Sequence, residues 1–356
     1  MIESSKLVVV IAAGGTAGHI RPALAVGEAL RARGATVTFA GSPDRVESRL
    51  VPEAGFELDT FEISGFPRKP SLELVRSLVR AAKAPFSCRA ILRRRRPDVV
   101  LGGGGYVAGP MVLAARLSRI PAALTEADAH LGLANRLAAP FASKLFLAYD
   151  IDGRSGSKVE VVGRPIPTAH LGASRADARA RFGIGIEAPV VAVFGALAGA
   201  TSLNEMAVGA WGDAGPTVVH VSGERDYDTL AARVHRPDYL LMPHTDQFGD
   251  VLAAADVAVS RAGGTVWELA AAGTPSILVP YPHATADHQT LNARHFERGG
   301  GAIVVPNAEI AAVPALVESL LADPGRLTAM RTAMLGMARV DAADRIAEGV
   351  IALARG

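Results

Sequence analysis

Four glycine-rich loops are the first feature of this sequence that could support chemistry. They lie at residues 14–18, 102–105, 195–199 and 262–265, and each follows a short apolar run. Glycine lets backbone N–H groups approach an anion closely, and a helix that follows adds partial positive charge at its N-terminus. Together the loops predict a phosphate-bearing ligand, although any one of them is equally consistent with a simple strand-to-helix turn.

Several polar residues near these loops could act on such a ligand. His19 directly follows the first loop, where its imidazole could serve as a general base, donate to a phosphate or merely cap the loop. Glu268 lies near the start of a predicted helix, where a carboxylate can accept from both hydroxyls of a ribose or simply favour the helix N-terminus. His288 and Gln289 carry groups that suit sugar hydroxyls.

Other motifs are weaker. Glu126 and Asp128 follow a predicted strand and could form an acid and base pair or cap a helix over 131–140. A dinucleotide fingerprint over 103–108 follows the fourth predicted strand rather than the first, which counts against a nicotinamide cofactor. Two Asp-x-Asp triplets could hold a divalent metal, but such triplets are frequent in acidic surface loops. We therefore expect no cofactor and no metal.

The elements that position these groups follow from short apolar runs that alternate with segments of helical period. This alternation is typical of βα units that build parallel sheets. Helices are predicted at 22–33 and 264–272, and the polar stretch 150–157 marks a domain junction. The sequence predicts an α/β protein of two doubly wound Rossmann-like domains whose parallel sheets face an interdomain cleft. Strands are predicted at 7–12, 36–40, 58–63, 98–101, 121–125, 144–148, 159–162, 189–194, 216–221, 238–241, 256–260, 275–279 and 302–305.

Composition narrows the class of protein. With 356 residues, 49% of them apolar, the chain has ample material for two cores. Its single cysteine, Cys88, excludes an internal disulfide and fits a reducing cytoplasm. The uncharged stretch at residues 99–115 contains five glycines and Pro110, so we expect no membrane-spanning segment. A net charge of +2 argues against a nucleic-acid-binding protein.

The net charge hides an asymmetry between the two halves. Residues 1–163 contain 22 Lys or Arg and 15 Asp or Glu, whereas residues 164–356 contain 15 and 20. Ten of the basic residues fall in the segment 68–96, between apolar residues at helical spacing. This pattern is found in helices that lie on anionic membranes, and also in packed helices with a solvated charged face. The candidate membrane-contact residues are Leu72, Val75, Arg76, Val79, Arg80 and Lys83.

Longer strings of residues resemble a known family. The string 14–25 contains Gly-Gly-Thr-Ala-Gly-His-Ile and Pro-Ala-Leu-Ala, and further matching strings follow in family order over most of the chain. Together they resemble the MurG family of peptidoglycan N-acetylglucosaminyltransferases. The further matching strings lie at 98–107, 132–135, 162–165, 260–263, 268–269, 272–275, 288–289 and 292–293.

The resemblance implies a GT-B fold and an inverting hexosyl transfer that needs no metal. UDP-N-acetylglucosamine would be the donor, and the C4 hydroxyl of undecaprenyl-pyrophosphoryl-MurNAc-pentapeptide (lipid I) the acceptor, giving lipid II. Domain 1–160 would bind the acceptor and the anionic membrane surface, domain 161–339 would bind the UDP-sugar, and a helix over 340–356 would pack back on the first domain. The enzyme would act as a peripheral protein at the cytoplasmic face of the cell membrane.

The matched positions also imply roles for individual residues. His19, with help from Glu126, would be the catalytic base, Glu268 would hold the ribose diol, and Gln289 with His288 would hold sugar hydroxyls. The candidate donor-binding residues are Thr16, Ala17, Gly18, Asp128, Arg164, Leu197, Thr245, Gly263, Gly264, Thr265, Glu268, His288 and Gln289.

Three positions depart from the family pattern. Leu197 stands where a serine is expected, Asp128 where an asparagine is expected, and Pro167 where an arginine is expected. These departures keep two alternatives open, although neighbours such as Arg164 could compensate. One alternative is another GT-B transferase, with a different nucleotide sugar or acceptor, and the other is a nucleotide-sugar-binding module with little turnover. A UDP-sugar epimerase would share the fold but would need no lipid surface.

Overall fold

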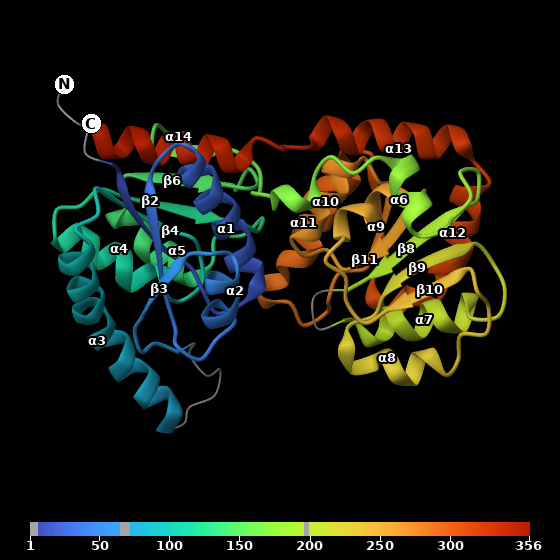
Figure 1. Cartoon of the computed structure of the whole chain (residues 1–356), viewed down its shortest axis with the longest axis horizontal. Helices are drawn as coiled ribbons and strands as arrows, with labels where there is room; N and C mark the ends of the chain where they lie inside the picture. The colour runs from blue at the N-terminus through green and yellow to red at the C-terminus, as the bar shows by residue number, and fades with distance from the viewer. Residues whose placement is uncertain (1–5, 65–71, 196–198) are drawn as a thin grey trace. The chain divides into compact units, whose positions relative to one another are not determined.

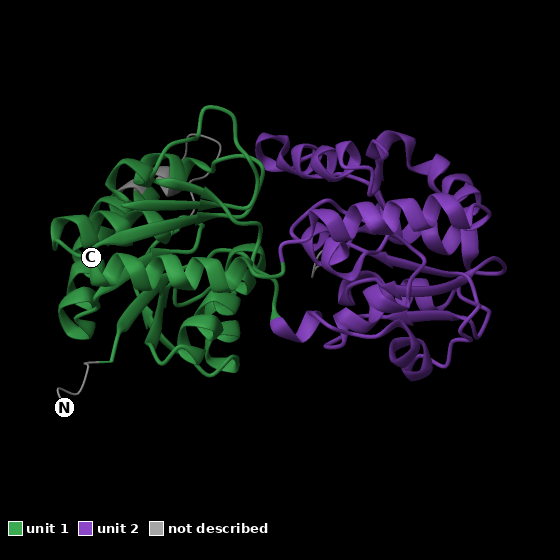
Figure 2. Cartoon of the chain, turned by 90° about the horizontal axis from the view of Figure 1, so that it is seen from above, with its two compact units in different colours: residues 1–167, 340–356 green, residues 168–339 purple. Residues whose placement is uncertain are grey.

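Parallel β-sheets organise the chain in a computed structural model (Figure 1). The structure describes residues 6–64, 72–195 and 199–356, and it describes only the backbone of residues 72–75 and 78. The chain divides into two compact units (Figure 2). Unit 1 comprises residues 1–167 and 340–356, and unit 2 comprises residues 168–339.

Unit 1 contains a seven-stranded parallel sheet with the strand order β3-β2-β1-β4-β5-β6-β7. The order reverses between β1 and β4, and in sheets of this kind ligands bind beyond the carboxyl ends of the strands at the point of reversal. The loops after β1 and β4 are therefore in the position of a site. The strands are β1 (Val8–Ala12), β2 (Thr36–Gly41), β3 (Glu57–Thr60), β4 (Val99–Gly102), β5 (Ala122–Glu126), β6 (Lys144–Leu147) and β7 (Val159–Val161).

Helices cover both faces of this sheet. Alternate residues of β1 enter different cores: Val9 and Ile11 pack in one cluster, and Val10 and Ala12 pack in the other. This explains why the strand is apolar throughout rather than alternating with polar residues. The helices are α1 (Ala17–Ala32), α2 (Glu47–Glu53), α3 (Leu72–Arg95), α4 (Ala108–Leu117), α5 (Leu133–Ala138), the short η1 (Ala139–Phe141) and α14 (Ala342–Arg355).

Helix α14 completes the core of unit 1 although it follows all of unit 2 in the sequence. Its residues Ile346, Ala347 and Val350 are fully buried in the cluster that contains Val9 of β1. Figure 1 shows α14, in red, beside the blue α1. Arg33, at the end of α1, pairs with Asp344 and Glu348 of α14.

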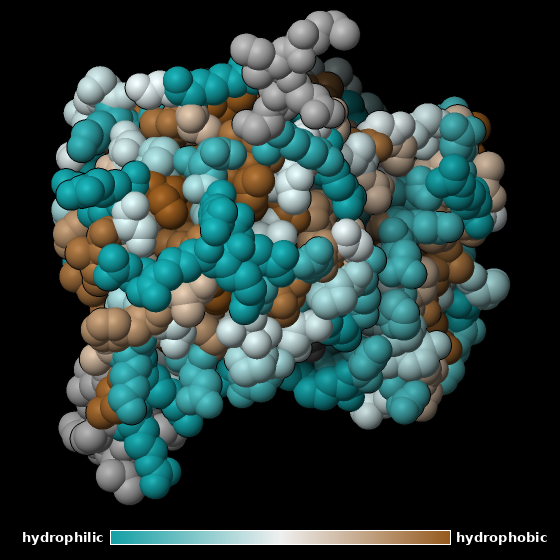
Figure 3. All heavy atoms as spheres, turned by 60° about the vertical axis from the view of Figure 1, so that its left-hand side comes forward, coloured by the Kyte–Doolittle hydropathy of each residue, from teal (hydrophilic) through white to brown (hydrophobic). Residues whose placement is uncertain are grey.

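Helix α3 packs against α4 on one side and exposes the other. Ala84 and Cys88 are buried, and burial raises the pKa of the Cys88 thiol to about 12, so it is no nucleophile. The opposite side exposes Val79 (48%) and Phe86 (77%). Figure 3 turns unit 1 forward and shows hydrophobic surface, in brown, between hydrophilic side chains, in teal. Arg76, Arg80 and Lys83 are exposed, whereas the side chains of Leu72 and Val75 lie outside the described residues.

Two arginines of the basic run at the end of α3 form ion pairs within unit 1. Arg94 and Arg95 bond the carboxylate of Asp59 on β3, with N–O distances of 2.6 and 2.7 Å. Burial of Asp59 opposes its ionisation, but the two guanidinium groups outweigh burial and lower the pKa of the carboxyl. These two arginines therefore fasten α3 to the edge of the sheet.

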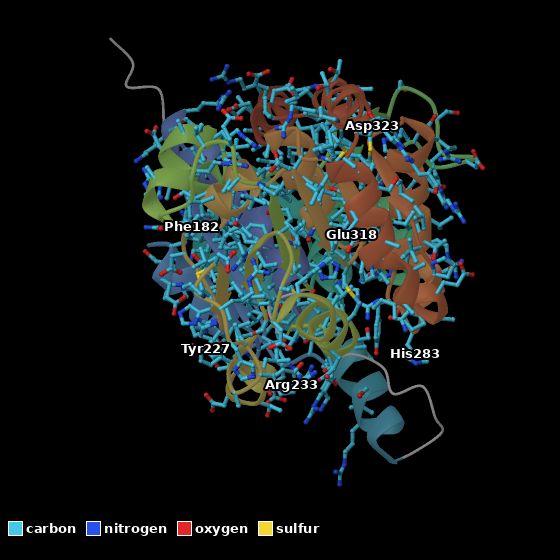
Figure 4. All side chains as sticks on the ribbon, turned by 90° about the vertical axis from the view of Figure 1, so that its right-hand side faces the viewer. Phe182, Tyr227, Arg233, His283, Glu318 and Asp323 are labelled. Carbon is cyan, nitrogen blue, oxygen red and sulfur yellow. The ribbon has the colours of Figure 1, made fainter. Side chains whose placement is uncertain are left out.

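Unit 2 repeats the doubly wound pattern with six parallel strands in the order β10-β9-β8-β11-β12-β13. Its exposed acidic residues include Glu318 and Asp323, both labelled in Figure 4. Asp323 caps the helix that follows it by accepting the N–H of Arg326. The strands are β8 (Val190–Phe194), β9 (Thr217–Val221), β10 (Tyr239–Met242), β11 (Val257–Ser260), β12 (Ser276–Leu278) and β13 (Ala302–Val304). The helices are η2 (Thr168–His170), α6 (Arg175–Arg181), α7 (Thr201–Trp211), α8 (Glu224–Ala231), α9 (Phe248–Ala254), α10 (Thr265–Ala272), η3 (Thr285–Asp287), α11 (His288–Arg298), η4 (Asn307–Ala312), α12 (Val313–Leu321) and α13 (Pro324–Met337).

Each predicted strand is present, with small shifts at its ends, but two predicted boundaries differ from the structure. The helix expected at 22–33 begins at Ala17, so His19 lies on its first turn rather than in a loop. Unit 1 extends to Pro167 rather than to residue 160, because β7 pairs with β6. Among the helices in the described ranges, none has the length and apolar character needed to cross a bilayer.

Candidate active site

His19 is held between two loops at the carboxyl edge of the unit 1 sheet. Its Nδ1 lies 3.1 Å from the hydroxyl oxygen of Thr16. The backbone of Gly104, with φ +97°, lies so close to the ring that a Cβ there would be 2.7 Å from its Cδ2 atom. If Nδ1–H donates to Thr16, then Nε2 is the basic nitrogen of the ring, which is the state a general base requires.

A buried carboxylate that sequence reasoning missed holds the first loop. Glu47 is 0% exposed; its Oε2 accepts the N–H of Gly15 and its Oε1 accepts the N–H of Ser42, each at 3.0 Å. Glu47 therefore ties the loop after β1 to the loop after β2. Only the pairing of these two strands brings it beneath the glycines, so no local spacing in the sequence could have indicated it.

Glu126 is also buried, and both of its oxygens are occupied. Oε1 accepts the N–H groups of Ala127 and Asp128, while Oε2 accepts the N–H of Gly132 and the amide of Asn135 at 2.9 Å. Burial raises the pKa of the carboxyl, and these hydrogen bonds oppose the rise. This geometry suits a residue that shapes the loop after β5 better than one that exchanges protons with a substrate.

Arg164 joins the two parts of the unit 1 site. Its side chain donates to the carbonyl oxygen of Gly18 at 2.6 Å and to that of Ala127 at 3.0 Å. Nη1 also lies 3.9 Å from a carboxylate oxygen of Asp128. Seven predicted residues therefore lie together beyond the ends of β1 and β5: Thr16, Ala17, Gly18, His19, Glu126, Asp128 and Arg164.

In unit 2, Glu268 lies in the first turn of α10, directly after the loop of Gly263 and Gly264. Glu268 is 9% exposed. Its Oε1 lies 3.3 Å from Nδ1 of His170. Its Oε2 is buried and accepts no hydrogen bond from the residues that the structure describes. A buried carboxylate oxygen without a protein partner marks a place where a water molecule or a ligand hydroxyl completes the hydrogen bonding.

His170 is a second residue that sequence reasoning missed. Its ring contacts the ring of Phe248, with centroids 5.5 Å apart, and Phe248 contacts Phe194 in turn at 5.0 Å. Because a carboxylate can only accept, Nδ1 of His170 must carry the hydrogen in its contact with Glu268. His170 lies far from Glu268 in sequence, which is why spacing did not reveal the pair.

The remaining predicted donor residues occupy the same edge or adjoining turns. Gln289 accepts the N–H of Tyr281 at 2.9 Å, and its amide nitrogen lies near Gly263. His288 donates from Nδ1 to the carbonyl of Thr285 at 2.8 Å. Thr265 begins α10, and the hydroxyl of Thr245 accepts the N–H of Gln247, which supports the turn before α9. Leu197 lies outside the described residues.

A buried polar network supports the loop after β8. His220 bonds the hydroxyl of Tyr239 at 2.8 Å and the amide oxygen of Asn204 at 3.0 Å. Asn204 donates onward to the carbonyl of Ser222 and to Asp226. Gly199, with φ +75°, approaches the same carbonyl so closely that no side chain would fit. Burial lowers the pKa of His220 to about 3, so the ring is neutral.

Sequence models of glycosyltransferase family 28 match both units. The N-terminal domain model matches residues 9–147, and the C-terminal domain model matches residues 190–346. These domains and the two parallel sheets define a glycosyltransferase of the GT-B class.

Comparison with individual relatives shows which family within this class the chain belongs to. A protein of Halothermothrix orenii is 37% identical over 341 residues, covering 90% of this chain and 92% of the relative. One of Mycobacterium avium is 40% identical, covering 98% and 89%. Both are named UDP-N-acetylglucosamine--N-acetylmuramyl-(pentapeptide) pyrophosphoryl-undecaprenol N-acetylglucosamine transferase. The crystal structure of Acinetobacter baumannii MurG is 27% identical, covers 98% of this chain and 99% of its own, and has a TM-score of 0.77. The chain belongs to the MurG family.

Proposed function

We propose that this protein transfers N-acetylglucosamine from UDP-N-acetylglucosamine to the C4 hydroxyl of the MurNAc-pentapeptide of lipid I, giving lipid II and UDP. The support is the similarity to the transferases above over almost the whole chain. The observation that carries the donor assignment is the unpartnered oxygen of Glu268 beside a glycine loop.

In this mechanism His19 accepts the proton of the acceptor hydroxyl through Nε2. The hydroxyl oxygen forms a bond to the anomeric carbon as the bond from that carbon to the UDP oxygen breaks, with inversion. Thr16 holds the ring through Nδ1. The glycine loop of unit 2 and the N-terminus of α10 stabilise the charge that develops on the departing diphosphate. Glu47 and Glu126 keep the loops in shape and exchange no proton with the substrate.

In unit 2, Glu268 accepts a ribose hydroxyl through Oε2, while His170 keeps Oε1 in place. The amide of Gln289 is close enough to Gly263 to contact a sugar that lies over this loop. Unit 2 is thus the donor-binding unit, and unit 1 carries the base and binds the acceptor.

The reaction is tested by measuring UDP release from UDP-N-acetylglucosamine with and without lipid I. A transferase releases UDP only when lipid I is present and forms lipid II in equal amount. An epimerase would convert the donor alone, and a binding module would release nothing. A thermal-shift series of nucleotide sugars tests donor identity, because Leu197, Asp128 and Pro167 depart from the family pattern.

We also propose that the exposed side of α3 lies on an anionic membrane surface. Arg76, Arg80 and Lys83 are exposed there beside Val79 and Phe86. Helix α4 and two elements that contact it, α5 and η1, expose further large apolar side chains, which sequence reasoning did not anticipate. A basic residue close to such a surface contributes about 1 kcal/mol, and apolar side chains add burial in the interface. These additional residues are Leu117, Leu133, Leu137 and Phe141.

Vesicle sedimentation tests this surface. Vesicles with anionic lipid should retain the protein, and changing Arg76, Arg80 and Lys83 to Glu should release it. A matched control changes three exposed arginines of unit 2, Arg233, Arg298 and Arg326, to Glu. Equal retention of the two triple variants would overturn the assignment.

A further inference from the structure

Helix α1 contains a proline near its start, and this leaves one carbonyl without its usual partner. In an α-helix, the N–H of residue i bonds the carbonyl of residue i−4. Pro22 lies inside α1 and has no N–H, so the carbonyl of Gly18 receives no such bond. The ring of the proline also pushes this carbonyl away from the helix axis. Gly18 directly precedes His19, so the gap lies on the turn that carries the proposed base.

Arg164 fills this gap from another part of unit 1. Its Nη2 donates to the Gly18 carbonyl at 2.6 Å, and Arg164 as a whole is only 7% exposed. Through Nη1 the same group donates to the carbonyl of Ala127, in the loop that Glu126 shapes. A planar guanidinium with several donors can span two carbonyls in this way, whereas the single ammonium of lysine cannot match its geometry.

We propose that Arg164 is a positioning residue for His19: it replaces the helix hydrogen bond that Pro22 removes and fixes the first turn of α1 against the loop after β5. This inference rests on the proposed function for the role of His19. It replaces the expectation from sequence that Arg164 binds the donor, because the two described hydrogen bonds of the guanidinium go to main-chain carbonyls of unit 1.

A double-mutant cycle tests the proposal, because Pro22→Ala restores the missing N–H. Arg164→Met, Pro22→Ala and the double variant are compared with the parent protein. Transfer to lipid I gives kcat and the KM for UDP-N-acetylglucosamine, and urea titration gives the unfolding equilibrium constant. If Arg164→Met does not fold, Arg164→Lys replaces it, since it keeps the charge and the aliphatic stem.

We expect Arg164→Met to lower kcat at least tenfold while KM for the donor changes less than twofold. In the Pro22→Ala background the same change should lower kcat threefold or less, and it should destabilise the fold less than it does in the parent. A rise in donor KM in both backgrounds, with no coupling, would mean that Arg164 contacts the donor and would overturn the proposal. The proposal would also be overturned if the two substitutions were coupled in their effect on unfolding but not in their effect on kcat. Arg164 would then have only a structural role.

Failure of the proposed function would be visible separately. A parent protein that folds and binds UDP but transfers nothing to lipid I would overturn the transferase assignment. In that protein the unfolding measurements would still show whether Arg164 and Pro22 are coupled. If the unfolding measurements showed no coupling, Arg164 would not replace the helix hydrogen bond that Pro22 removes.

Discussion

The buried carboxylates of the two units differ in how completely they are hydrogen-bonded. In unit 1, Glu47 lies against the first glycine loop and Glu126 lies in the loop after β5, and both oxygens of each accept hydrogen bonds from within that unit. In unit 2, Glu268 uses only one oxygen, and the other accepts no hydrogen bond from the described residues. The comparison teaches that a buried carboxylate near a loop indicates a ligand site only when one of its oxygens accepts no hydrogen bond from the protein.

This difference has an energetic basis. Leaving a buried acceptor unsatisfied costs about 1–3 kcal/mol, and more when it is charged. A chain keeps such a group where a ligand completes it, and loses stability in the unliganded state by doing so. A carboxylate that accepts several N–H groups is stable without any ligand. We therefore expect Glu47 and Glu126 to support the fold and Glu268 to support binding.

The largest effect on turnover should come from His19, the proposed base of unit 1. His19→Ala removes the proposed base and should lower kcat about 10²- to 10⁴-fold, with little change in UDP affinity. Transfer to lipid I and calorimetry with UDP measure the two quantities. His235→Ala, on the exposed surface of unit 2, is the control. If turnover were unchanged in His19→Ala, unit 1 would not supply the catalytic base through this residue.

The same substitution placed in each unit tests the comparison directly. Glu126→Gln turns an NH₂ group towards backbone N–H groups and should lower the free energy of unfolding by about 2–3 kcal/mol. Glu268→Gln removes a charge that is only half satisfied, so it should leave stability unchanged or raise it. Urea titration of the two variants measures the difference. Equal destabilisation would show that hydrogen-bond saturation does not separate the two carboxylates.

A smaller effect is expected on donor affinity. Glu268→Gln should raise the Kd of UDP about tenfold, because the amide accepts more weakly than a carboxylate. The Kd of 2′,3′-dideoxyuridine diphosphate should change little, because this ligand lacks both ribose hydroxyls. Calorimetry measures the four values. If the two ligands lose affinity equally, Oε2 of Glu268 does not bind the ribose.

A pH-dependent effect of similar size extends the comparison to a neutral group of unit 2 whose two ring nitrogens are both hydrogen-bonded. The pKa of His220 is lowered from 6.5 to about 3 in the folded protein, so the unfolded chain takes up the proton first as pH falls. Its contribution to stability is complete above pH 6.5 and is lost below it, by about 1.4 kcal/mol per pH unit. Urea midpoints between pH 7 and pH 5 measure this slope. His220→Phe should flatten it, and an equal slope in the variant would contradict the assignment.

Sequence reasoning predicted the elements better than the interactions between them. The strands could be predicted because their apolar runs are local, and His19 and Glu268 could be proposed as site residues because each adjoins a glycine loop. His170 was missed because its partner is 98 residues away, and Glu47 was missed because strand pairing brings it to Gly15. Glu126 and Arg164 were predicted as parts of the site from their positions in the sequence. Their hydrogen bonds could not be predicted, because these depend on how the chain folds.

The place of α14 in unit 1 also affects how the protein is made. Val9 and Ile11 of β1 share a core with Ile346 and Val350, and the ribosome adds all of residues 168–339 before it reaches that helix. At a translation rate of about 5–20 residues per second, this interval lasts roughly 10 to 30 s. During that time, the nascent first unit lacks α14, one of the helices that pack on the face of its sheet formed by Val9 and Ile11. The half that is synthesised first therefore finishes folding second, and we expect it to be the half that chaperones bind on the ribosome.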